Sequence, residues 1–262
     1  MMGNHSHIDE RFAGDELDLS VWFPFYLPHW SSRSESRATY AIEQDGLHLS
    51  IPPEQPRWCD GLHTEPMRVS CIQSGSFAGP LGSTIGQQPF QTGLLVREKQ
   101  PAFRGYVPHF GQIEITMRMQ VTSRSMAAFW LVGFEDQPDR SGEICVAEVF
   151  GDAIDGDLAR VGMGIHAFRD PLLEESFTTV PMAMDVSIDH TYGIDWSPDS
   201  VAFMVDGAVM HQQRQAPDYP MQLMIGVFDF PNKHSSLVKT PPVPKLIVSH
   251  IRGRELTTAI PA

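Results

Sequence analysis

Residues 112–121 read QIEITMRMQV, and apolar side chains occupy every second position from Ile113 to Val121. Polar or charged side chains occupy the positions between them. Because successive side chains of a β-strand point to opposite faces, this pattern predicts a strand with one face in a core and the other in water. The chain contains no run at the helical period of 3.6 residues that is longer than two turns. These observations favour an all-β fold.

Similar stretches predict further strands on both sides of this one. An Asp45-Gly46 turn precedes the alternating residues 47–51, and Asp206-Gly207 separates two short strands in the pattern of a hairpin. The 21 glycines and 21 prolines imply many turns. A sandwich of two sheets is therefore predicted. Its other strands are expected at residues 127–134, 143–150, 160–168, 190–196, 221–230 and 245–251.

No change of composition divides the chain into two domains. The first ninety residues are richer in Pro, Ser and Gly, and we expect them to form loops that wrap the sandwich. Residues 1–12 are expected to be a flexible N-terminal leader, and residues 13–262 a single domain. The 262 residues lie within the range of one large β domain.

The charge of the chain argues against several classes of partner. Lys and Arg number 19 and Asp and Glu number 32, which gives a formal net charge of −13. Such a surface repels phosphate backbones and anionic lipids, so neither nucleic acid nor a membrane is an expected partner. The start of the chain has no apolar stretch like that of a signal peptide, so we expect a cytoplasmic protein or one whose leader has been removed. A monomer is expected.

The sequence offers no set of metal ligands. Cys59, Cys71 and Cys145 form no C-x-x-C pair, and the eleven histidines include no His-Glu-x-x-His. Cys59 and Cys71 are close enough in sequence for a disulfide, but reduced thiols are the favoured interpretation. No metal and no cofactor are therefore predicted.

Residues 141–151 read SGEICVAEVFG and place two glutamates in an apolar strand. Burying a carboxylate is costly unless it is paired or used. On a regular strand Glu143 and Cys145 share a face, and Glu148 points to the opposite one. A one-residue bulge between Cys145 and Glu148 would bring both glutamates to one face. In a cleft, two such carboxyl groups can lie about 5–5.5 Å apart, as in a retaining glycosidase.

This stretch resembles the signature of the laminarinase-like members of glycoside hydrolase family 16. Their Glu-x-Asp-x-x-Glu on a bulged strand corresponds to Glu143-x-Cys145-x-x-Glu148. The resemblance extends over about residues 90 to 252 and implies a concanavalin-like β-jelly roll: two antiparallel sheets with a concave substrate cleft. It also implies retaining hydrolysis of a β-linked glycan. Four neighbouring stretches match the family in order: AFWL at 128–131, GIH at 164–166, HTYGIDWSPDS with the following VDG at 190–207, and PMQLM at 220–224.

The resemblance also implies roles for the residues of this stretch. Glu143 would be the nucleophile, which must stay ionised, and Glu148 the general acid/base, with a pKa raised by burial and by its negative neighbour. Cys145 stands where the family has an aspartate that hydrogen-bonds the nucleophile. A thiol is a weak donor, so we expect Cys145 to orient Glu143 poorly but to be tolerated, with activity slower, shifted in pH or lost.

His166 would, by its family position, hydrogen-bond the acid/base region. On the same face of its predicted strand stand Gly162 and Gly164, which we expect to leave open space for a sugar. From the residues alone, the favoured expectation is that the His166 ring satisfies a backbone group, and the resemblance makes the two expectations equal.

Aromatic side chains are candidates for stacking on sugar rings. Trp130 lies on the strand beside the signature, and Trp30 and Trp58 lie in Pro-rich loops, where a core position is an equal alternative. Phe228 could line the cleft as well, although a Phe228–Phe230 alternation is more often found in a core. Some relatives bind calcium on the convex face, but no spaced ligand loop supports a calcium site here.

The leading hypothesis is a retaining, endo-acting glycoside hydrolase that cleaves β-1,3-linked glucan by double displacement. The alternatives are a relative with the same bulge that acts on galactan or agar, and a non-catalytic glycan-binding jelly roll whose Cys145 marks a decayed site. The partner expected in the leading case is a β-glucan polysaccharide.

Overall fold

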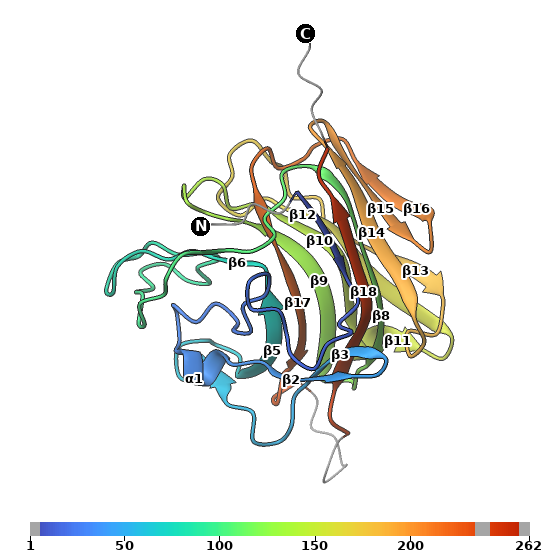
Figure 1. Ribbon diagram of the computed structural model, residues 1–262, viewed down its shortest axis with the longest axis horizontal. Coiled ribbons are helices and arrows are strands. Elements are labelled where there is room, and N and C mark those ends of the chain that lie inside the picture. The colour runs from blue at the N-terminus through green and yellow to red at the C-terminus, as the bar shows by residue number, and fades with distance from the viewer. Residues whose placement is uncertain (1–5, 234–241, 257–262) are drawn as a thin grey trace.

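The computed structural model describes residues 6–233 and 242–256 of the chain and contains two large antiparallel sheets that face one another (Figure 1). We name the first the back sheet. Its strand order is β16 (Ala208–Gln213), β15 (Ser200–Val205), β14 (His190–Ser197), β8 (Gly111–Gln120), β18 (Lys245–Arg254), β3 (Gly46–Ser50) and β2 (Thr39–Glu43), with β1 (His7–Glu10) also on β18.

The second sheet, the front sheet, carries the strand with the two glutamates. Its order is β11 (Ile154–Asp155), β12 (Leu158–His166), β10 (Glu143–Phe150), β9 (Ser125–Gly133), β17 (Met221–Asp229), β5 (Met67–Gln73) and β4 (Arg57–Trp58), with β13 (Thr178–Ala183) also on β12. The remaining elements are the pair β6 (Gly75–Ser76) and β7 (Phe103–Arg104), the helix α1 (Arg33–Ser36) and the 3-10 turn η1 (Gly151–Ala153).

The main hydrophobic core lies between the two sheets. Ile113 and Ile115 of β8 enter it from the back sheet, and Val146 and Val161 enter it from the front sheet. The alternation of β8 is the cause, because its apolar positions are buried while Gln112 and the other polar positions are partly or fully exposed. The prediction of a two-sheet, all-β sandwich is therefore confirmed, and its arrangement is that of a jelly roll.

A second hydrophobic cluster covers the outer face of the front sheet. Leu27, Trp30 and Trp58 from the N-terminal segment pack there against side chains of β9 and β17, such as Trp130 and Phe228. The first ninety residues thus do wrap the sandwich, but they also supply strands. In particular, β5 lies inside the front sheet, between β17 and β4.

Several local predictions can be compared with the structure. The hairpin of β15 and β16 turns at Asp206 and Gly207, which both have positive φ, as the Asp-Gly pair predicts. The turn before β3 falls one residue earlier than predicted, because Gly46 already pairs with Glu43. His7–Glu10 forms β1 on β18, which corrects the expected leader at these four residues.

The sheets join segments that are far apart in the chain. β1 and β3 both pair with β18, and β5 pairs with β17 (Figure 1). All three cysteines are buried free thiols. Within the described ranges, no helix has the length and apolar character needed to cross a membrane.

Candidate active site

The predicted bulge in β10 is present. Cys145 pairs with Trp130 and Ala147 with Phe129, so Val146 is the extra residue opposite β9. The pairing with β12 shows the same shift, between Cys145 and Glu148. Val146 and Ala147 consequently both point into the main core, and Glu148 returns to the face of Glu143 and Cys145.

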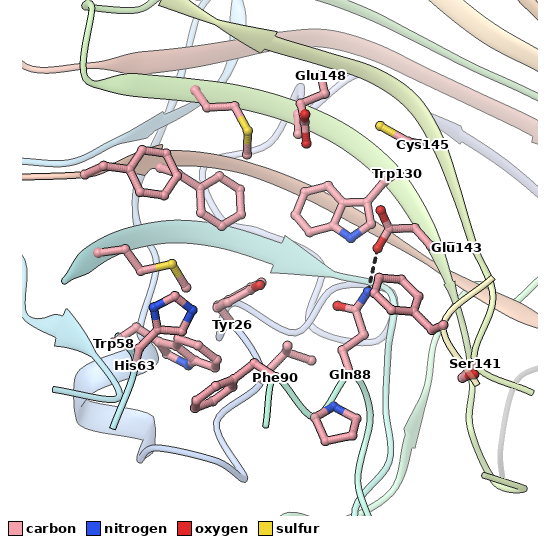
Figure 2. Close-up of a pocket in the computed structure, with 18 of the residues that line it drawn as sticks. Tyr26, Trp58, His63, Gln88, Phe90, Trp130, Ser141, Glu143, Cys145 and Glu148 are labelled. Carbon is pink, nitrogen blue, oxygen red and sulfur yellow. Dashed lines mark hydrogen bonds between the residues drawn. The ribbon is translucent and has the colours of Figure 1, made fainter. Parts of the chain in front are cut away.

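Glu143, Cys145 and Glu148 line one cavity on the outer face of the front sheet (Figure 2). The cavity has a volume of about 570 Å³, within the usual range for a small-molecule site. Its floor comes from β9, β10 and β17, and its walls come from loops that include residues 26–27, 88–90 and 168–169. Two carboxylates on one face of such a cleft are the arrangement needed for acid/base work together with nucleophilic attack.

Three of the four predicted stacking residues line this cavity: Trp130, Trp58 and Phe228. Their rings are only 2–6% exposed and form a connected aromatic cluster with Tyr26, which lies 5.0 Å from Trp58 and 5.5 Å from Phe228 between ring centroids. Figure 2 shows Trp58 at the side of the cleft away from Glu148, with Tyr26 between Trp58 and Trp130. The sequence did not single out Tyr26, which lies in the N-terminal segment that was expected to form loops.

Trp30 does not take the predicted place along the groove. Its side chain is 0% exposed, and its indole Nε1 donates to the carbonyl oxygen of Gln87 at 2.7 Å. A ring without exposed surface cannot stack on a sugar, so the expectation for Trp30 is corrected. It is a core residue that supports the loop at Gln87.

Both glutamates have raised pKa values. Burial, and next the charge of Glu148, raise the pKa of Glu143 to about 8, against a hydrogen bond from Gln88 that lowers it. Burial raises the pKa of Glu148, and the charges of His166 and Lys233 lower it. The raised value at Glu148 agrees with the expected acid. At Glu143 the raised pKa opposes the ionised form that the expected nucleophile needs.

Cys145 does not replace the missing aspartate as a partner of Glu143. Its Sγ points to the backbone oxygen of Gly162 on β12, at 3.9 Å. Burial, followed by the charges of Glu148 and Glu143, raises the pKa of this thiol well above its usual value. The side chain is thus a neutral group at neutral pH, with its weak donor turned away from Glu143.

Two polar residues that the sequence did not point to complete the cleft near Glu143. Gln88 Nε2 donates to Glu143 Oε2 at 2.6 Å. Glu135, which follows β9, accepts a hydrogen bond from the Gln88 backbone nitrogen and contacts Arg169. Burial raises the pKa of Glu135 to about 7. Neither residue belongs to a recognisable motif, because their contacts join parts of the chain that are 47 and 55 residues apart.

The space over Gly162 and Gly164 is not open. A Cβ at Gly162 would lie 2.5 Å from the ring of Phe177, and one at Gly164 would lie 2.5 Å from the Ser176 oxygen. The two glycines therefore admit the segment before β13 rather than a sugar, which corrects the expectation. His166 pairs with Glu143 across the strands, its ring stacks on Phe177 at 4.7 Å, and its Nδ1 lies 2.6 Å from Glu175.

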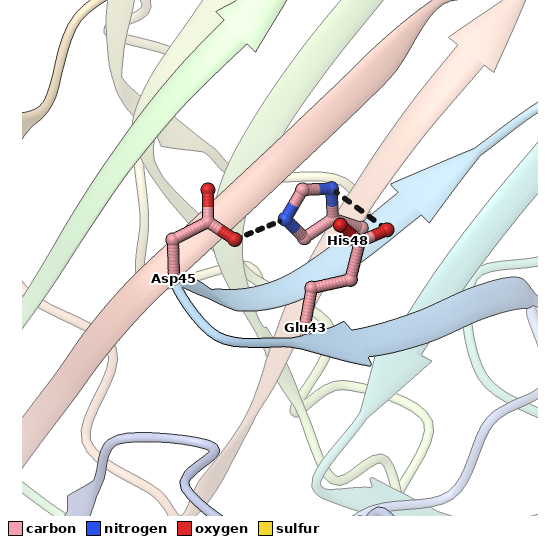
Figure 3. Close-up of side chains that lie close together, drawn as sticks. All are labelled: Glu43, Asp45 and His48. Carbon is pink, nitrogen blue, oxygen red and sulfur yellow. Dashed lines mark hydrogen bonds and ion pairs between the residues drawn. The ribbon is translucent and has the colours of Figure 1, made fainter.

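A separate cluster with metal-ligand chemistry lies on the back sheet, around the turn between β2 and β3. Glu43, Asp45 and His48 come together there (Figure 3). His48 Nε2 lies 2.8 Å from Asp45, and Arg118 also contacts this carboxylate. Since a cation already neutralises Asp45, the contacts describe an ion-pair network. The absence of a metal or cofactor stays a prediction.

Comparisons with known proteins give a consistent picture. The family model of glycosyl hydrolases family 16 matches residues 106–237, just over half of the chain. A Crh-like protein 5 of Aspergillus fumigatus is 31% identical over 87 residues, which are 30% of this chain and 22% of that protein. A glucan endo-1,3-beta-glucosidase of Cryptopygus antarcticus is 30% identical over 107 residues, 39% of each chain. The matches thus span well under half of these curated relatives.

The fold is also found among solved structures. An endo-β-galactosidase of Clostridium perfringens that releases GlcNAcα1-4Gal superposes with a TM-score of 0.77 at 22% identity. The superposition covers 97% of this chain and 63% of that one. At this level of identity the likeness concerns the fold. The family model, which includes the bulged strand with Glu143 and Glu148, identifies the chain as a member of glycosyl hydrolases family 16.

Proposed function

We propose that the protein is a retaining, endo-acting glycoside hydrolase that cleaves β-1,3-linked glucan by double displacement. One observation carries the proposal: the bulge at Val146 brings Glu143 and Glu148 to the same face of β10, in a cleft lined by aromatic rings. A sugar chain that binds on the rings would cross β10 above these two carboxyl groups.

The two carboxyl groups take different roles in this mechanism. Glu143 attacks the anomeric carbon and forms a glycosyl-enzyme, while Glu148 gives a proton to the departing oxygen. Glu148 then removes a proton from water, which releases the sugar from Glu143. The attack by Glu143 requires that the two carboxyl groups together carry one proton and that this proton is on Glu148.

Burial and mutual repulsion support a pair that carries one proton near neutral pH. Both pKa values are raised, so the two groups are not ionised together until the solution is alkaline. In such a pair the two carboxyl groups share the proton, and the apparent pKa values describe the pair rather than either residue. The hydrogen bond from Gln88 favours negative charge on Glu143, and this is the productive arrangement.

The choice of β-1,3-glucan rests on the five-residue spacing of the glutamates and on the Cryptopygus antarcticus relative, a glucan endo-1,3-beta-glucosidase. The same fold in a galactosidase from Clostridium perfringens supports galactan as the second candidate. A substrate panel separates the two. We expect release of reducing ends from laminarin, and at most slow release from barley glucan, agarose and galactan.

The test of the mechanism compares the native protein with Glu143→Gln and Glu148→Gln, and with Glu54→Gln as a control in an exposed loop. We expect each active-site change to lower kcat/KM on the preferred glycan by at least about 100-fold, because each removes a group that acts in the transition state. The control should keep the native rate. NMR of the first product should show the β-anomer.

Three outcomes would contradict this proposal. Equal rates in the native protein and both active-site variants would exclude the two glutamates from catalysis. An α-anomer as first product would exclude retention. Binding of laminarin without turnover by the native protein would favour the non-catalytic, glycan-binding alternative.

A further inference from the structure

The Glu143 carboxylate lacks the aspartate partner of the family signature, and Cys145 does not supply one. The Cys145 Sγ points to Gly162 on the neighbouring strand. Among the residues that the structure describes, the hydrogen-bond donor to the Glu143 carboxylate is Gln88, whose Nε2 lies 2.6 Å from Oε2. Figure 2 shows Gln88 reaching Glu143 from the loop that faces β10 across the cleft.

Gln88 is held in a conformation that a free loop would not favour. Its φ is +46°, in the left-handed region that a residue with a Cβ rarely adopts. Its backbone nitrogen donates to Glu135 Oε1 at 2.8 Å. Glu135 is only 3% exposed and is itself paired with Arg169. Backbone in an unfavourable region persists where the surroundings fix it, and it is found at functional sites.

The residue before Gln88 ties the loop to the front sheet. Gln87 is fully buried; its Oε1 accepts from the Phe77 nitrogen at 2.9 Å, and its Nε2 donates to Gln222 Oε1 on β17 at 2.7 Å. The Trp30 indole donates to the Gln87 carbonyl oxygen. The Gln88 amide therefore extends from an anchored backbone, so it can fix the position of Glu143.

We propose that Gln88 is a positioning residue which takes over the task of the missing aspartate: it orients the Glu143 carboxylate and holds the negative charge of the carboxylate pair on that side. The inference rests on the proposed role of Glu143 as nucleophile. It adds a residue from a segment 55 positions earlier in the chain, outside the Glu143–Glu148 stretch.

The charged surroundings of Glu143 make this donor important. Glu148 and Cys145 stand beside it on β10, Glu135 follows β9, Glu175 precedes β13, and the half-buried Tyr26 lies near it in the N-terminal segment. All three carboxylates oppose a negative charge on Glu143. The Gln88 amide lowers the pKa of Glu143, so its removal raises that pKa and moves negative charge to Glu148.

The experiment replaces Gln88 by methionine, which has nearly the same volume and cannot donate. The matched control is Gln91→Met, an exposed residue of the same loop. For Gln88→Met we expect kcat/KM to fall by about 10- to 100-fold, the usual effect of losing one hydrogen bond to a charged group. The loss should appear in kcat rather than KM, and the acidic limb of the pH profile should move to higher pH. Gln91→Met should match the native protein.

A rescue variant separates positioning from general damage. Adding Cys145→Asp to Gln88→Met restores the partner that the family places there. We expect the double variant to regain at least about ten-fold of the lost kcat/KM if Gln88 replaces that aspartate. A double variant as slow as Gln88→Met would contradict the proposal that Gln88 replaces the aspartate of the family signature.

A titration keeps the inference independent of turnover. In protein with ¹³C-labelled glutamate, assigned with Glu143→Gln, the carboxyl signal of Glu143 should titrate at higher pH in Gln88→Met than in the native protein. If the native protein cleaves none of the glycans, the proposed function fails. The titration still shows whether the hydrogen bond from Gln88 lowers the pKa of Glu143. An unchanged Glu143 titration in Gln88→Met, or a native kcat/KM with an unmoved pH profile, would overturn the role of Gln88.

Discussion

Glu143 combines a functional position with an unfavourable environment. The pKa of this carboxyl is raised to about 8 by burial and by Glu148, and that of Glu135 is raised to about 7 by burial. Such groups oppose folding whenever the unfolded chain can ionise them. Active sites commonly carry a cost of this kind, because the groups that react are held where isolated charges are disfavoured.

The sign of this cost can be tested. Between pH 4.5 and about 8 the unfolded chain ionises both glutamates while the folded Glu143–Glu148 pair keeps one proton, so the free energy of unfolding decreases as pH rises through that window. Glu143→Gln removes this contribution. We expect its melting temperature near pH 8 to exceed that of the native protein by at least about 2 °C, and the gain to shrink towards pH 4.5.

Glu54→Gln removes one negative charge from an exposed position and serves as the control for net charge. An equal gain in both variants would mean that the overall charge of −13, and not the burial of Glu143, sets the effect.

The contacts of Gln88 show where residue-level prediction from sequence stops. Glu143, Cys145 and Glu148 could be placed together because they lie on one strand and obey its two-residue period, apart from one bulge. The contact from Gln88 depends on how a distant loop crosses the sheet. No local pattern carries that information, and for the same reason the sequence could not decide between a core and a cleft position for Trp30, which lies buried beneath the same loop.

At the scale of elements, the bulge in β10 decides which residues face the cleft. Deleting Val146 would restore regular pairing with β9 and would leave Glu148 four positions after Glu143, still on the same face. We expect this deletion to lower kcat/KM, because the position of Glu148 relative to Glu143 changes, and to destabilise the fold, because a buried valine is lost from the core. Circular dichroism and thermal unfolding, together with kcat/KM, measure both effects.

Val146→Ala is the matched change that keeps the number of residues. It removes two methyl groups from the core and should cost about 2 kcal/mol of stability, with the glutamates still in place. Native activity after the deletion would show that the bulge does not position Glu148.

The segment before β13 closes one side of the carboxylate pair. Phe177 lies over Gly162 and stacks on His166, and it is not among the residues that line the cavity over β9, β10 and β17. We expect Phe177→Ala to open binding space on that side and to shift the products of laminari-oligosaccharides, as chromatography would show. Leu172→Ala, at a residue that is 88% exposed, is the control. An unchanged product pattern in Phe177→Ala would show that Phe177 does not limit the site.

One of the strands that the sequence did not predict shows a limit of periodicity. Met67–Gln73 forms β5 with nearly every residue buried, including Ser70 and Gln73. Ile72 packs in the main core and Val69 in the outer cluster, so both faces of the strand are covered. A strand buried on two sides has no polar face, and the alternation that revealed β8 is absent.

For the whole molecule, the sandwich was predictable because its back sheet has one wet face, which leaves the two-residue period visible in β8 and β14. The residues that line the cleft were less predictable from the sequence. The N-terminal segment contributes Tyr26, Trp58 and Gln88 to it, although its composition indicates only turns. The division of the chain into a leader and a single domain stays a prediction beyond the four residues of β1.

The pairing of β18 with β1, β3 and β8 has a consequence for the order in which the molecule can form. Residue 254 meets residue 7, so the back sheet closes only after a loop of almost the whole chain has been brought together. Topologies dominated by such distant pairings fold slowly, and their unpaired edges stay open to other chains meanwhile. Refolding by dilution should therefore be slow and sensitive to protein concentration, with β18 as the last strand to gain protection against hydrogen exchange.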